Sequence, residues 1–227
     1  MTIIMNKISI APSIAAGNLL RLEDEVRHLE AGGADAIHFD VMDGHFVPLL
    51  TIGVPFLEAM RKITKLPLDV HIMVSNPDHV AQHYLDAGAD ILTFPIETAK
   101  HPDRLCQQIR DAGRKAGVVL NPSTHWNSIE FLLPTLNQIT IMSVNPGYSR
   151  QTHINDVHPK IKALAEFCQK SFPHIEIQID GGVNLKNIGI LAQLGATNFV
   201  TGGAVMGQPD YKKAISQLRD AASKVLA

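Results

Sequence analysis

The amino-acid sequence predicts an α/β fold, a single (β/α)8 barrel built on eight parallel strands. Short apolar or β-branched runs alternate with amphipathic stretches of helical periodicity along the whole chain. A weak repeat, in which a helix end and a glycine precede a turn and an apolar strand, recurs at 30–40, 86–96 and 193–202. Eight such units fit a chain of 227 residues without any linker. We expect one barrel domain over 1–227 rather than a doubly wound open sheet, because no GxGxxG motif follows the first strand.

The individual elements follow from the periodicity. Short apolar or β-branched runs predict strands at 8–13, 36–42, 67–73, 90–96, 115–120, 139–144, 175–180 and 198–202. Amphipathic stretches between them predict helices at 22–33, 79–89, 102–114, 157–170 and 187–196. In the first of these helices, Leu22, Val26 and Leu29 recur at helical spacing and should face the sheet.

Four of the expected helices run into a glycine, namely Gly32, Gly88, Gly113 and Gly195. Glycine adopts the left-handed backbone conformation that commonly ends a helix. We therefore expect these four residues to end their helices and to lead the chain into the next strand.

Composition limits the class of protein. The chain is 45% hydrophobic and carries a formal net charge of −2, which gives no field for nucleic acid or for an anionic membrane surface. No apolar run approaches the length of a membrane span, and the first ten residues are too short and too polar for a signal peptide. The two cysteines, Cys106 and Cys168, form neither a disulfide framework nor a CxxC motif. These features predict a cytoplasmic protein that binds neither membrane nor nucleic acid.

Polar residues at three strand ends suggest a metal centre. His38 and Asp40 are two residues apart in the second expected strand, so their side chains point the same way. His71 ends the third strand and Asp180 the seventh, and in such a barrel the strand carboxyl ends form the reactive face. Two imidazoles and two carboxylates suit one divalent ion of zinc, iron, manganese or cobalt. Residues 43–45 turn the chain away, and we assign them no chemical role.

Each of these residues also has an ordinary structural explanation. A lone histidine in a strand is commonly a hydrogen-bonded core or rim residue, and a lone aspartate at a strand end commonly caps the next helix. Their coincidence at one rim favours a site. His125 and Trp126, in the loop after the fifth strand, are candidates for substrate contact. We expect the remaining histidines outside the loop 43–45 to lie at the surface: His28, His79, His83, His101, His153, His158 and His174.

Three glycine-bearing loops follow late strands, at 143–150 (SVNPGYSR), 179–184 (IDGGVN) and 201–207 (TGGAVMG). Late loops that present backbone N–H groups at a short helix are the usual phosphate-binding segments of these barrels. Arg150 would add a charged contact. A glycine pair after a single strand is also explained by the entry of a helix, but three such loops at one end favour a phosphate site.

At this level of detail the chain resembles a known family. The segments IAPSI, IHFDVMDGHFVP, TIG, LPLDVHIMV, VLNPST, MSVNPG and IQIDGGVN follow, in order, the motifs of ribulose-phosphate 3-epimerases. The resemblance covers about 8–207. It implies interconversion of D-ribulose 5-phosphate and D-xylulose 5-phosphate in the pentose phosphate pathway, with a ketose phosphate as the small-molecule partner. It also implies a homo-oligomer, a dimer or larger.

The resemblance implies a role for individual residues. His38, Asp40, His71 and Asp180 match the family's ligands to one divalent metal ion, and Asp40 and Asp180 match its acid/base pair. Its substrate-binding positions fall on Ser13, Met42, His71, Met73, Met142, Gly147, Tyr148, Ser149, Arg150, Gly181, Gly182, Gly202 and Gly203. Two carboxylates on opposite sides of a flat cis-enediolate explain such an epimerisation, one as base and one as acid. For Met142, ordinary core packing is an equally good explanation.

The chain departs from the family pattern in several loops. The first loop reads SIAAGNL where SILSADF is usual, Pro95 stands where a histidine is frequent, and TGGAV replaces a segment in which Gly-Ser is common. Ser149 and Arg150 replace two glycines that should help a loop close over phosphate. Two alternatives therefore stay open: a 3-epimerase of another ketose phosphate, such as a hexulose 6-phosphate, or a barrel that binds a phosphosugar without turnover. The presence of both Asp40 and Asp180 argues against the second.

Overall fold

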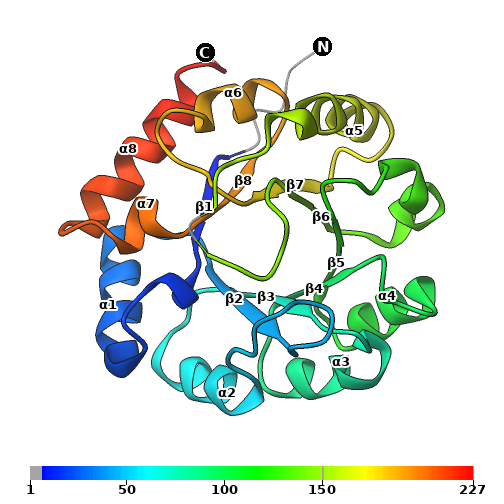
Figure 1. Ribbon diagram of the computed structural model, residues 1–227, viewed down its shortest axis with the longest axis horizontal. Helices are drawn as coiled ribbons and strands as arrows, with labels where there is room; N and C mark the ends of the chain where they lie inside the picture. The colour runs from blue at the N-terminus through cyan, green and yellow to red at the C-terminus, as the bar shows by residue number, and fades with distance from the viewer. Residues whose placement is uncertain (1–6, 150, 227) are drawn as a thin grey trace.

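The strands form a ring around the centre of the molecule, as Figure 1 shows in a view along the ring's axis. The computed structural model describes residues 7–149 and 151–226. The eight strands pair in the order β1-β8-β7-β6-β5-β4-β3-β2, and every registered pair is parallel. A single parallel bridge between Ser13 and His38 joins β1 to β2, so the barrel is nearly closed. The strands are β1 (Ser9–Pro12), β2 (Ile37–Met42), β3 (Leu68–Met73), β4 (Ile91–Pro95), β5 (Lys115–Leu120), β6 (Gln138–Met142), β7 (Glu176–Asp180) and β8 (Asn198–Thr201).

The predicted strands are confirmed, with ends within two residues of those observed. The open-sheet alternative is wrong, because β1 pairs with β8 over four residues and so brings the first and last strands together. This closure fixes which residues meet at the strand ends. The carboxyl ends of all eight strands lie at one rim, since all pairs are parallel.

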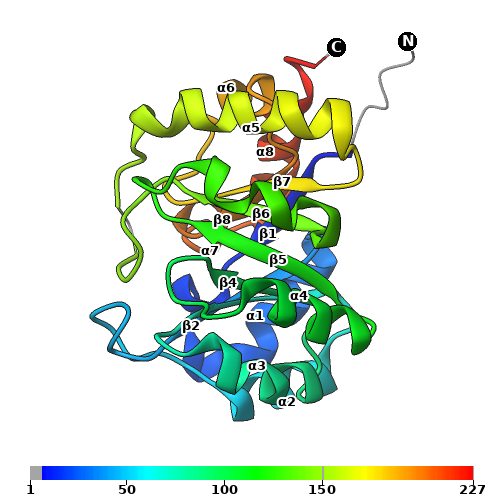
Figure 2. The same cartoon turned by 90° about the vertical axis from the view of Figure 1, so that its right-hand side faces the viewer.

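Helices surround the barrel and cover its outer surface (Figures 1 and 2). The five predicted helices are confirmed, and the structure adds α2, α7 and α8. Helices α2, α3, α4 and α5 each begin with a proline in the first turn, where its missing N–H costs nothing. The helices are α1 (Leu22–Gly32), α2 (Val54–Ile63), α3 (Pro77–Asp86), α4 (Pro102–Asp111), α5 (His158–Ser171), α6 (Ile188–Gln193), α7 (Gly203–Met206) and α8 (Tyr211–Ser223), with 3-10 turns η1 (Ile14–Ala16), η2 (Leu19–Arg21), η3 (Trp126–Thr135) and η4 (Asn155–Val157).

Three of the four predicted helix-ending glycines are in the left-handed region, with φ of 105° at Gly88, 72° at Gly113 and 101° at Gly195. The prediction is wrong for Gly32, because the residue with positive φ is Gly33, at 80°. Gly32 is the last residue of α1, and a β-carbon there would lie 3.2–3.4 Å from atoms at the start of α8. The glycine at this position therefore allows α1 and α8 to pack closely.

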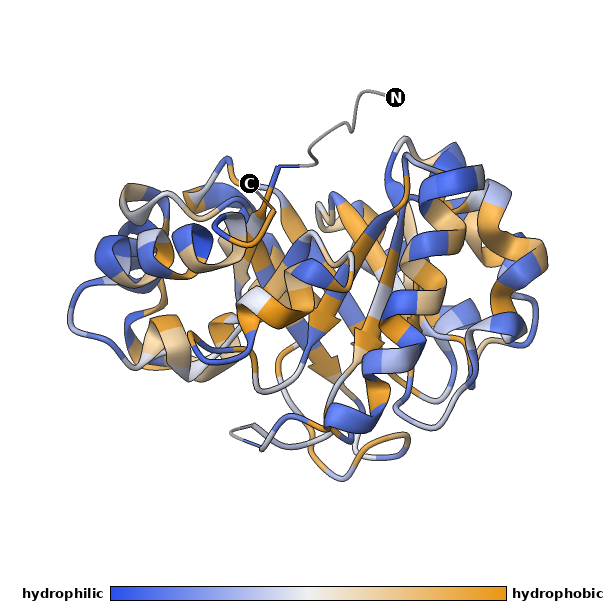
Figure 3. Ribbon diagram, turned by 90° about the horizontal axis from the view of Figure 1, so that it is seen from above, coloured by the Kyte–Doolittle hydropathy of each residue, from blue (hydrophilic) through white to orange (hydrophobic). Residues whose placement is uncertain are grey.

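The apolar core lies between the barrel wall and the helices. Phe39, Phe94 and Phe199 are among the largest fully buried side chains, and Figure 3 shows the strands as the most continuously hydrophobic part of the molecule. The barrel interior is different, because it also holds buried polar side chains: His38, Asp69, His71, Thr93, Gln138, Thr140 and Gln178. Buried polar groups need hydrogen-bond partners, so we expect these side chains to contact one another inside the barrel.

Within residues 7–149 and 151–226, none of the helices is long and apolar enough to cross a membrane. Cys106 and Cys168 are buried free thiols, as expected from the absence of a disulfide pattern. Burial raises the pKa of both thiols to about 11, so both stay protonated near neutral pH.

Candidate active site

The structure brings the four predicted metal-binding residues together. His38 and Asp40 come from β2, His71 from β3 and Asp180 from β7, and one ligand atom from each lies within 4.8 Å of the others. Strand register explains the arrangement, because Asp40 is paired with His71 across β2 and β3. His38 and Asp40 project on the same side of β2, as their spacing predicts.

The distances in this cluster leave a gap that a small cation fits. His38 Nε2 lies 3.2 Å from Asp40 Oδ1 and 3.7 Å from Asp180 Oδ2. His71 Nδ1 lies 3.7 Å from the same Asp40 oxygen and 3.8 Å from the same Asp180 oxygen. Both ring nitrogens of His71 are buried and have no hydrogen-bond partner among the described residues. A buried imidazole without partners, facing two carboxylates, fits a divalent metal ion as the missing partner.

The electrostatics of the cluster also favour a cation. Burial acts to lower the pKa of His38, but the charges of Asp40 and Asp69 outweigh it and raise that pKa well above its ordinary value. Burial likewise opposes a rise at His71, and the Asp180 and Asp40 carboxylates still raise its pKa. Burial acts to raise the pKa of Asp40, yet the positive charge of His38 holds it below its usual range. The carboxylates of Asp40 and Asp180, of whose side chains only 13% and 14% are exposed, thus favour positive charge at the centre of the cluster.

Ser13, at the end of β1, lies against one of these carboxylates. Its hydroxyl donates a hydrogen bond of 2.6 Å to Asp40 Oδ2. Asp40 Oδ1 faces the two histidines, so both of its oxygens are held in place. Contact between Ser13 and substrate stays a prediction, while its contact with Asp40 is a finding of the structure.

The three methionines predicted to line the site are buried at the same end of the barrel. Met42 and Met73 follow Asp40 and His71 by two residues each, and they pack with Val47 in one small apolar cluster. Met142 is paired with Asp180 across β6 and β7 and packs with Val119 and Val144. Their positions suit both a role at the substrate and ordinary apolar packing, so substrate contact stays a prediction.

The predicted phosphate-binding glycines have tightly constrained backbones. Gly147, Gly181 and Gly182 have positive φ values of 115°, 126° and 64°. A β-carbon on Gly147 would lie 2.7 Å from Pro48 Cδ, so the loop after β6 lies against the loop after β2. Figure 2 shows these two loops projecting on the same side of the molecule.

The remaining predicted phosphate contacts come from the loops after β6 and β8. Gly203 opens the short helix α7, directly after Gly202 and the end of β8. Tyr148 and Ser149 are exposed in the loop after β6, whereas Arg150 lies outside the described residues. Binding of phosphate by any of these residues stays a prediction.

Asp43 has a role that the sequence analysis missed. Its Oδ1 accepts hydrogen bonds from the backbone N–H groups of His45 (2.8 Å) and Phe46 (2.9 Å). Its Oδ2 accepts from the backbone N–H and the hydroxyl of Ser75, both at 2.8 Å. Burial acts to raise the pKa of Asp43, but these four donors lower it to about 2. Asp43 therefore ties the loop after β2 to the loop after β3, beside the candidate site.

Two histidines predicted at the surface are partly buried, so that prediction is wrong for His153 and His158. Their Nε2 atoms lie 2.9 Å apart, and His153 Nδ1 lies 3.2 Å from the carbonyl oxygen of Gly181. His153 lies in the loop after β6, which packs against the loop after β7, a contact that local sequence does not encode. His28, His79, His83, His101, His125 and His174 are exposed.

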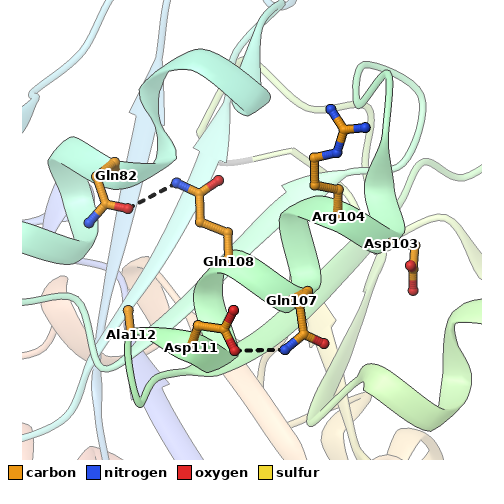
Figure 4. A pocket seen from close by; sticks show the side chains of 7 residues that line it. All are labelled: Gln82, Asp103, Arg104, Gln107, Gln108, Asp111 and Ala112. Atoms are coloured by element: carbon orange, nitrogen blue, oxygen red, sulfur yellow. Dashed lines mark hydrogen bonds between the residues drawn. The ribbon is translucent and has the colours of Figure 1, made fainter.

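Two surface depressions lie away from this cluster. One of about 670 Å³ lies between α3 and α4 on the outer layer, where Gln108 Nε2 donates to Gln82 Oε1 at 2.9 Å (Figure 4). A second of about 520 Å³ is lined by residues of the loop after β7 and of the α7–α8 region. Neither is lined by any of the four clustered residues.

Comparison with known proteins agrees with the site. Residues 9–206 match the model of the ribulose-phosphate 3 epimerase family. The ribulose-phosphate 3-epimerase of Bacillus subtilis is 46% identical over 213 residues, which cover 93% of this chain and 98% of that protein. The ribulose-phosphate 3-epimerase of Escherichia coli is 41% identical over 222 residues, or 97% of this chain and 99% of that protein.

More distant solved structures share the fold alone. Thiamine phosphate pyrophosphorylase from Pyrococcus furiosus is 18% identical, with a TM-score of 0.67 and 98% of each chain covered. The 3-hexulose-6-phosphate synthase from Salmonella typhimurium is 15% identical, with a TM-score of 0.67, covering 96% of this chain and all of that one. The full-length sequence similarity, together with the converged His/Asp cluster, shows that the chain belongs to the ribulose-phosphate 3-epimerase family.

Proposed function

We propose that this protein is a metal-dependent epimerase that interconverts D-ribulose 5-phosphate and D-xylulose 5-phosphate at C3, in the pentose phosphate pathway. The observation that carries the proposal is the meeting of Asp40 and Asp180, from β2 and β7, in one buried cluster with two imidazoles. Family membership supports the same reaction. Residues 1–227 would act as a single barrel unit.

The two carboxylates would move the protons. In one direction, Asp40 removes the C3 proton from one face of the substrate and Asp180 returns a proton to the opposite face. The substrate passes through a planar cis-enediolate, and in the reverse direction the two carboxylates exchange roles. Ser13 holds Oδ2 of Asp40 through its 2.6 Å hydrogen bond and so keeps that carboxylate oriented.

His38, Asp40, His71 and Asp180 would hold one divalent ion of zinc, iron, manganese or cobalt. When bound, such an ion supplies Lewis-acid stabilisation of negative charge at the reacting oxygens. The sulfur side chains of Met42, Met73 and Met142 would exclude water from the reacting carbons without competing as hard ligands.

The phosphate group of the substrate would lie at the loops after β6, β7 and β8. The proposed contacts are Gly147, Tyr148, Ser149, Arg150, Gly181, Gly182, Gly202 and Gly203. Backbone N–H groups in loops of this kind bind phosphate oxygens. The short helix α7 directly after β8 supports this placement.

The decisive experiment is an assay with D-ribulose 5-phosphate after chelation and metal add-back. The wild type is compared with Asp180→Asn and with Asp86→Asn, a matched control on the exposed side of α3. We expect metal-dependent turnover in the wild type and in the control, and its loss in the Asp180 variant. Absence of turnover by the metal-loaded wild type would reject this substrate.

The altered loop after β6, with Ser149 and Arg150 in place of two glycines, favours a second candidate. This is a 3-epimerase of another ketose phosphate, such as a hexulose 6-phosphate. Competition between the two substrates in one assay separates the candidates through the ratio of their kcat/KM values. Deuterium incorporation at C3 from heavy water separates both from a barrel that binds a phosphosugar without turnover.

The family also suggests a homo-oligomer, a dimer or larger. Sedimentation velocity of the full chain measures its mass directly. A species of twice the 24.8 kDa chain mass or more supports this part of the proposal, and a monomer at micromolar concentration contradicts it.

A further inference from the structure

A fifth polar residue, Asp69, lies next to the candidate metal site and is completely buried. It is two residues before His71 on β3, so its side chain points into the barrel on the same side. In the β2–β3 register it is paired with His38, and its Oδ2 lies 3.0 Å from His38 Nδ1. Asp69 thus contacts the ring edge of His38 that faces away from the other three ligands.

Three donors converge on this carboxylate. Besides His38 Nδ1, the amide nitrogen of Gln178 donates to Oδ2 at 2.6 Å and that of Gln138 donates to Oδ1 at 3.3 Å. The orientation of the Gln178 amide is fixed, because its oxygen accepts from Thr140 Oγ1 at 2.7 Å and from Gln138 Nε2 at 3.1 Å. A protonated carboxyl would add an O–H donor that has no acceptor among these three donors, so the arrangement fits an ionised carboxylate.

This network determines which nitrogen of His38 keeps its proton when a metal ion is bound. With Asp69 as an acceptor, Nδ1 must be an N–H donor, so Nε2, which faces the two carboxylates of the cluster, is the nitrogen that gives up its proton to bind the metal ion. Metal-bound histidines typically donate their other N–H to a carboxylate, which fixes both tautomer and ring orientation.

We propose that Asp69 is a positioning residue that accepts a hydrogen bond from His38 Nδ1 and so directs His38 Nε2 toward the metal. The side-chain amides of Gln138 and Gln178 hold Asp69 in place by donating to its carboxylate. This inference rests on the proposed function, since it assigns the supporting residues of the same metal site. The inference goes beyond the proposed function because it gives only one of the two histidine ligands, His38, a supporting carboxylate. His71 has no carboxylate behind it, because its Nε2 is buried without a partner among the described residues.

The test compares the wild type with Asp69→Asn. Asparagine offers one acceptor oxygen and two N–H groups to a site that presents three donors, so it cannot satisfy them all. We expect Co(II) affinity, measured by competition with a chelator, to fall 10–100-fold in the variant. The matched control is Thr93→Val, which removes another buried hydroxyl of the barrel, one that donates to the carbonyl oxygen of Val70 at 3.4 Å and is outside the Asp69 network. Its Co(II) affinity should stay within about two-fold of the wild type.

A spectroscopic measurement reports on His38 itself. In the Zn(II)-loaded protein with ¹⁵N-labelled histidine, we expect His38 to show metal-bound Nε2 and a downfield Nδ1–H that exchanges slowly with solvent. In Asp69→Asn this proton should shift upfield and exchange faster, and a merely structural role for Asp69 would leave it unchanged. If the variant does not fold, the wild-type spectrum decides, because coordination through Nδ1 overturns the proposal.

The outcomes separate the two proposals. A wild type that binds neither Co(II) nor Zn(II) overturns the metal site on which both rest. A wild type that binds Co(II), beside an Asp69→Asn variant of equal affinity and unchanged Nδ1–H signal, overturns the role of Asp69 alone. Loss of affinity in Thr93→Val as large as in Asp69→Asn also overturns it, because the effect would then follow from any change in the buried interior of the barrel.

Discussion

Replacement of Ser13 by alanine tests whether Asp40 is ionised in the folded protein. The Ser13 hydroxyl donates to Asp40 Oδ2 at 2.6 Å, and only 7% of Ser13 and 13% of the Asp40 side chain are exposed. A hydrogen bond to a charged group contributes roughly 1.5–3 kcal/mol, against about 1 kcal/mol for a neutral pair. Because some water reaches Asp40, we expect the free energy of unfolding of Ser13→Ala to fall by about 2 kcal/mol.

The matched control is Ser143→Ala. Its buried hydroxyl shares its one proton between two neutral acceptors, the carbonyl oxygens of Gly181 (2.7 Å) and Asp180 (3.0 Å). We expect this variant to lose about 1 kcal/mol. For a chain of this length, the two losses correspond to decreases in Tm of roughly 4–8 °C and 2–4 °C. Urea unfolding of the metal-free proteins measures both.

The lowered pKa of Asp40 predicts how its contribution to stability changes with pH. Burial alone would raise the pKa of Asp40, but the charge of His38 holds it below its ordinary value, so the ionised form stabilises the fold. That contribution is complete above the unfolded-state pKa of about 3.9 and is lost as the pH falls below it. The deficit of Ser13→Ala should therefore be constant between pH 5 and pH 8. A deficit no larger than that of Ser143→Ala, or one that disappears at pH 5, would refute the assignment of Asp40 as an ionised acceptor.

Three further predictions concern two glycines, the loss of stability at low pH and the metal. The free energy of unfolding of Gly195→Ala, measured in urea, should fall by about 2–3 kcal/mol, because φ is 101° and the new β-carbon would lie 2.5 Å from that of Ala165. Gly113→Ala has φ of 72° and open space around the new β-carbon, so it should lose only the backbone contribution of about 1 kcal/mol. Asp43, with a pKa of about 2, stabilises the fold above pH 4 and loses this effect toward pH 2. The difference in free energy of unfolding between the wild type and Asp43→Asn should therefore decrease from pH 4 to pH 2, and a constant difference would contradict this. A divalent metal ion at 100 times its Kd should add about 2.7 kcal/mol to the free energy of unfolding. Chelation should therefore lower Tm and metal add-back should restore it, and in His71→Gln add-back should not restore it.

The sequence by itself determined the barrel and which residues meet in its candidate site. Alternation of strand and helix periods predicts the fold, because each unit must bury its own apolar face against the next. The spacing of His38 and Asp40 places them on one strand face. The rule that parallel strands end at one rim then brings His71 and Asp180 to the same place.

The sequence by itself did not predict contacts between distant segments. The segment LDVHIM contains Asp69, two residues before His71, but the hydrogen-bond partners of Asp69, Gln138 and Gln178, lie 69 and 109 residues further along the chain. Likewise, the burial of His153 depends on how two loops fold over each other. The local sequence pattern does not predict such long-range contacts.

Local geometry near the ends of elements was also decided by packing. Gly32 and Gly33 are equivalent in the sequence as helix-ending residues. The close approach of α8 requires the absence of a side chain at Gly32, and the left-handed turn falls on Gly33. The sequence thus determined which residues meet at the rim, through strand period and topology. Only the tertiary structure decided how those residues are supported, because hydrogen bonds across the barrel depend on strand register and closure rather than on neighbours along the chain.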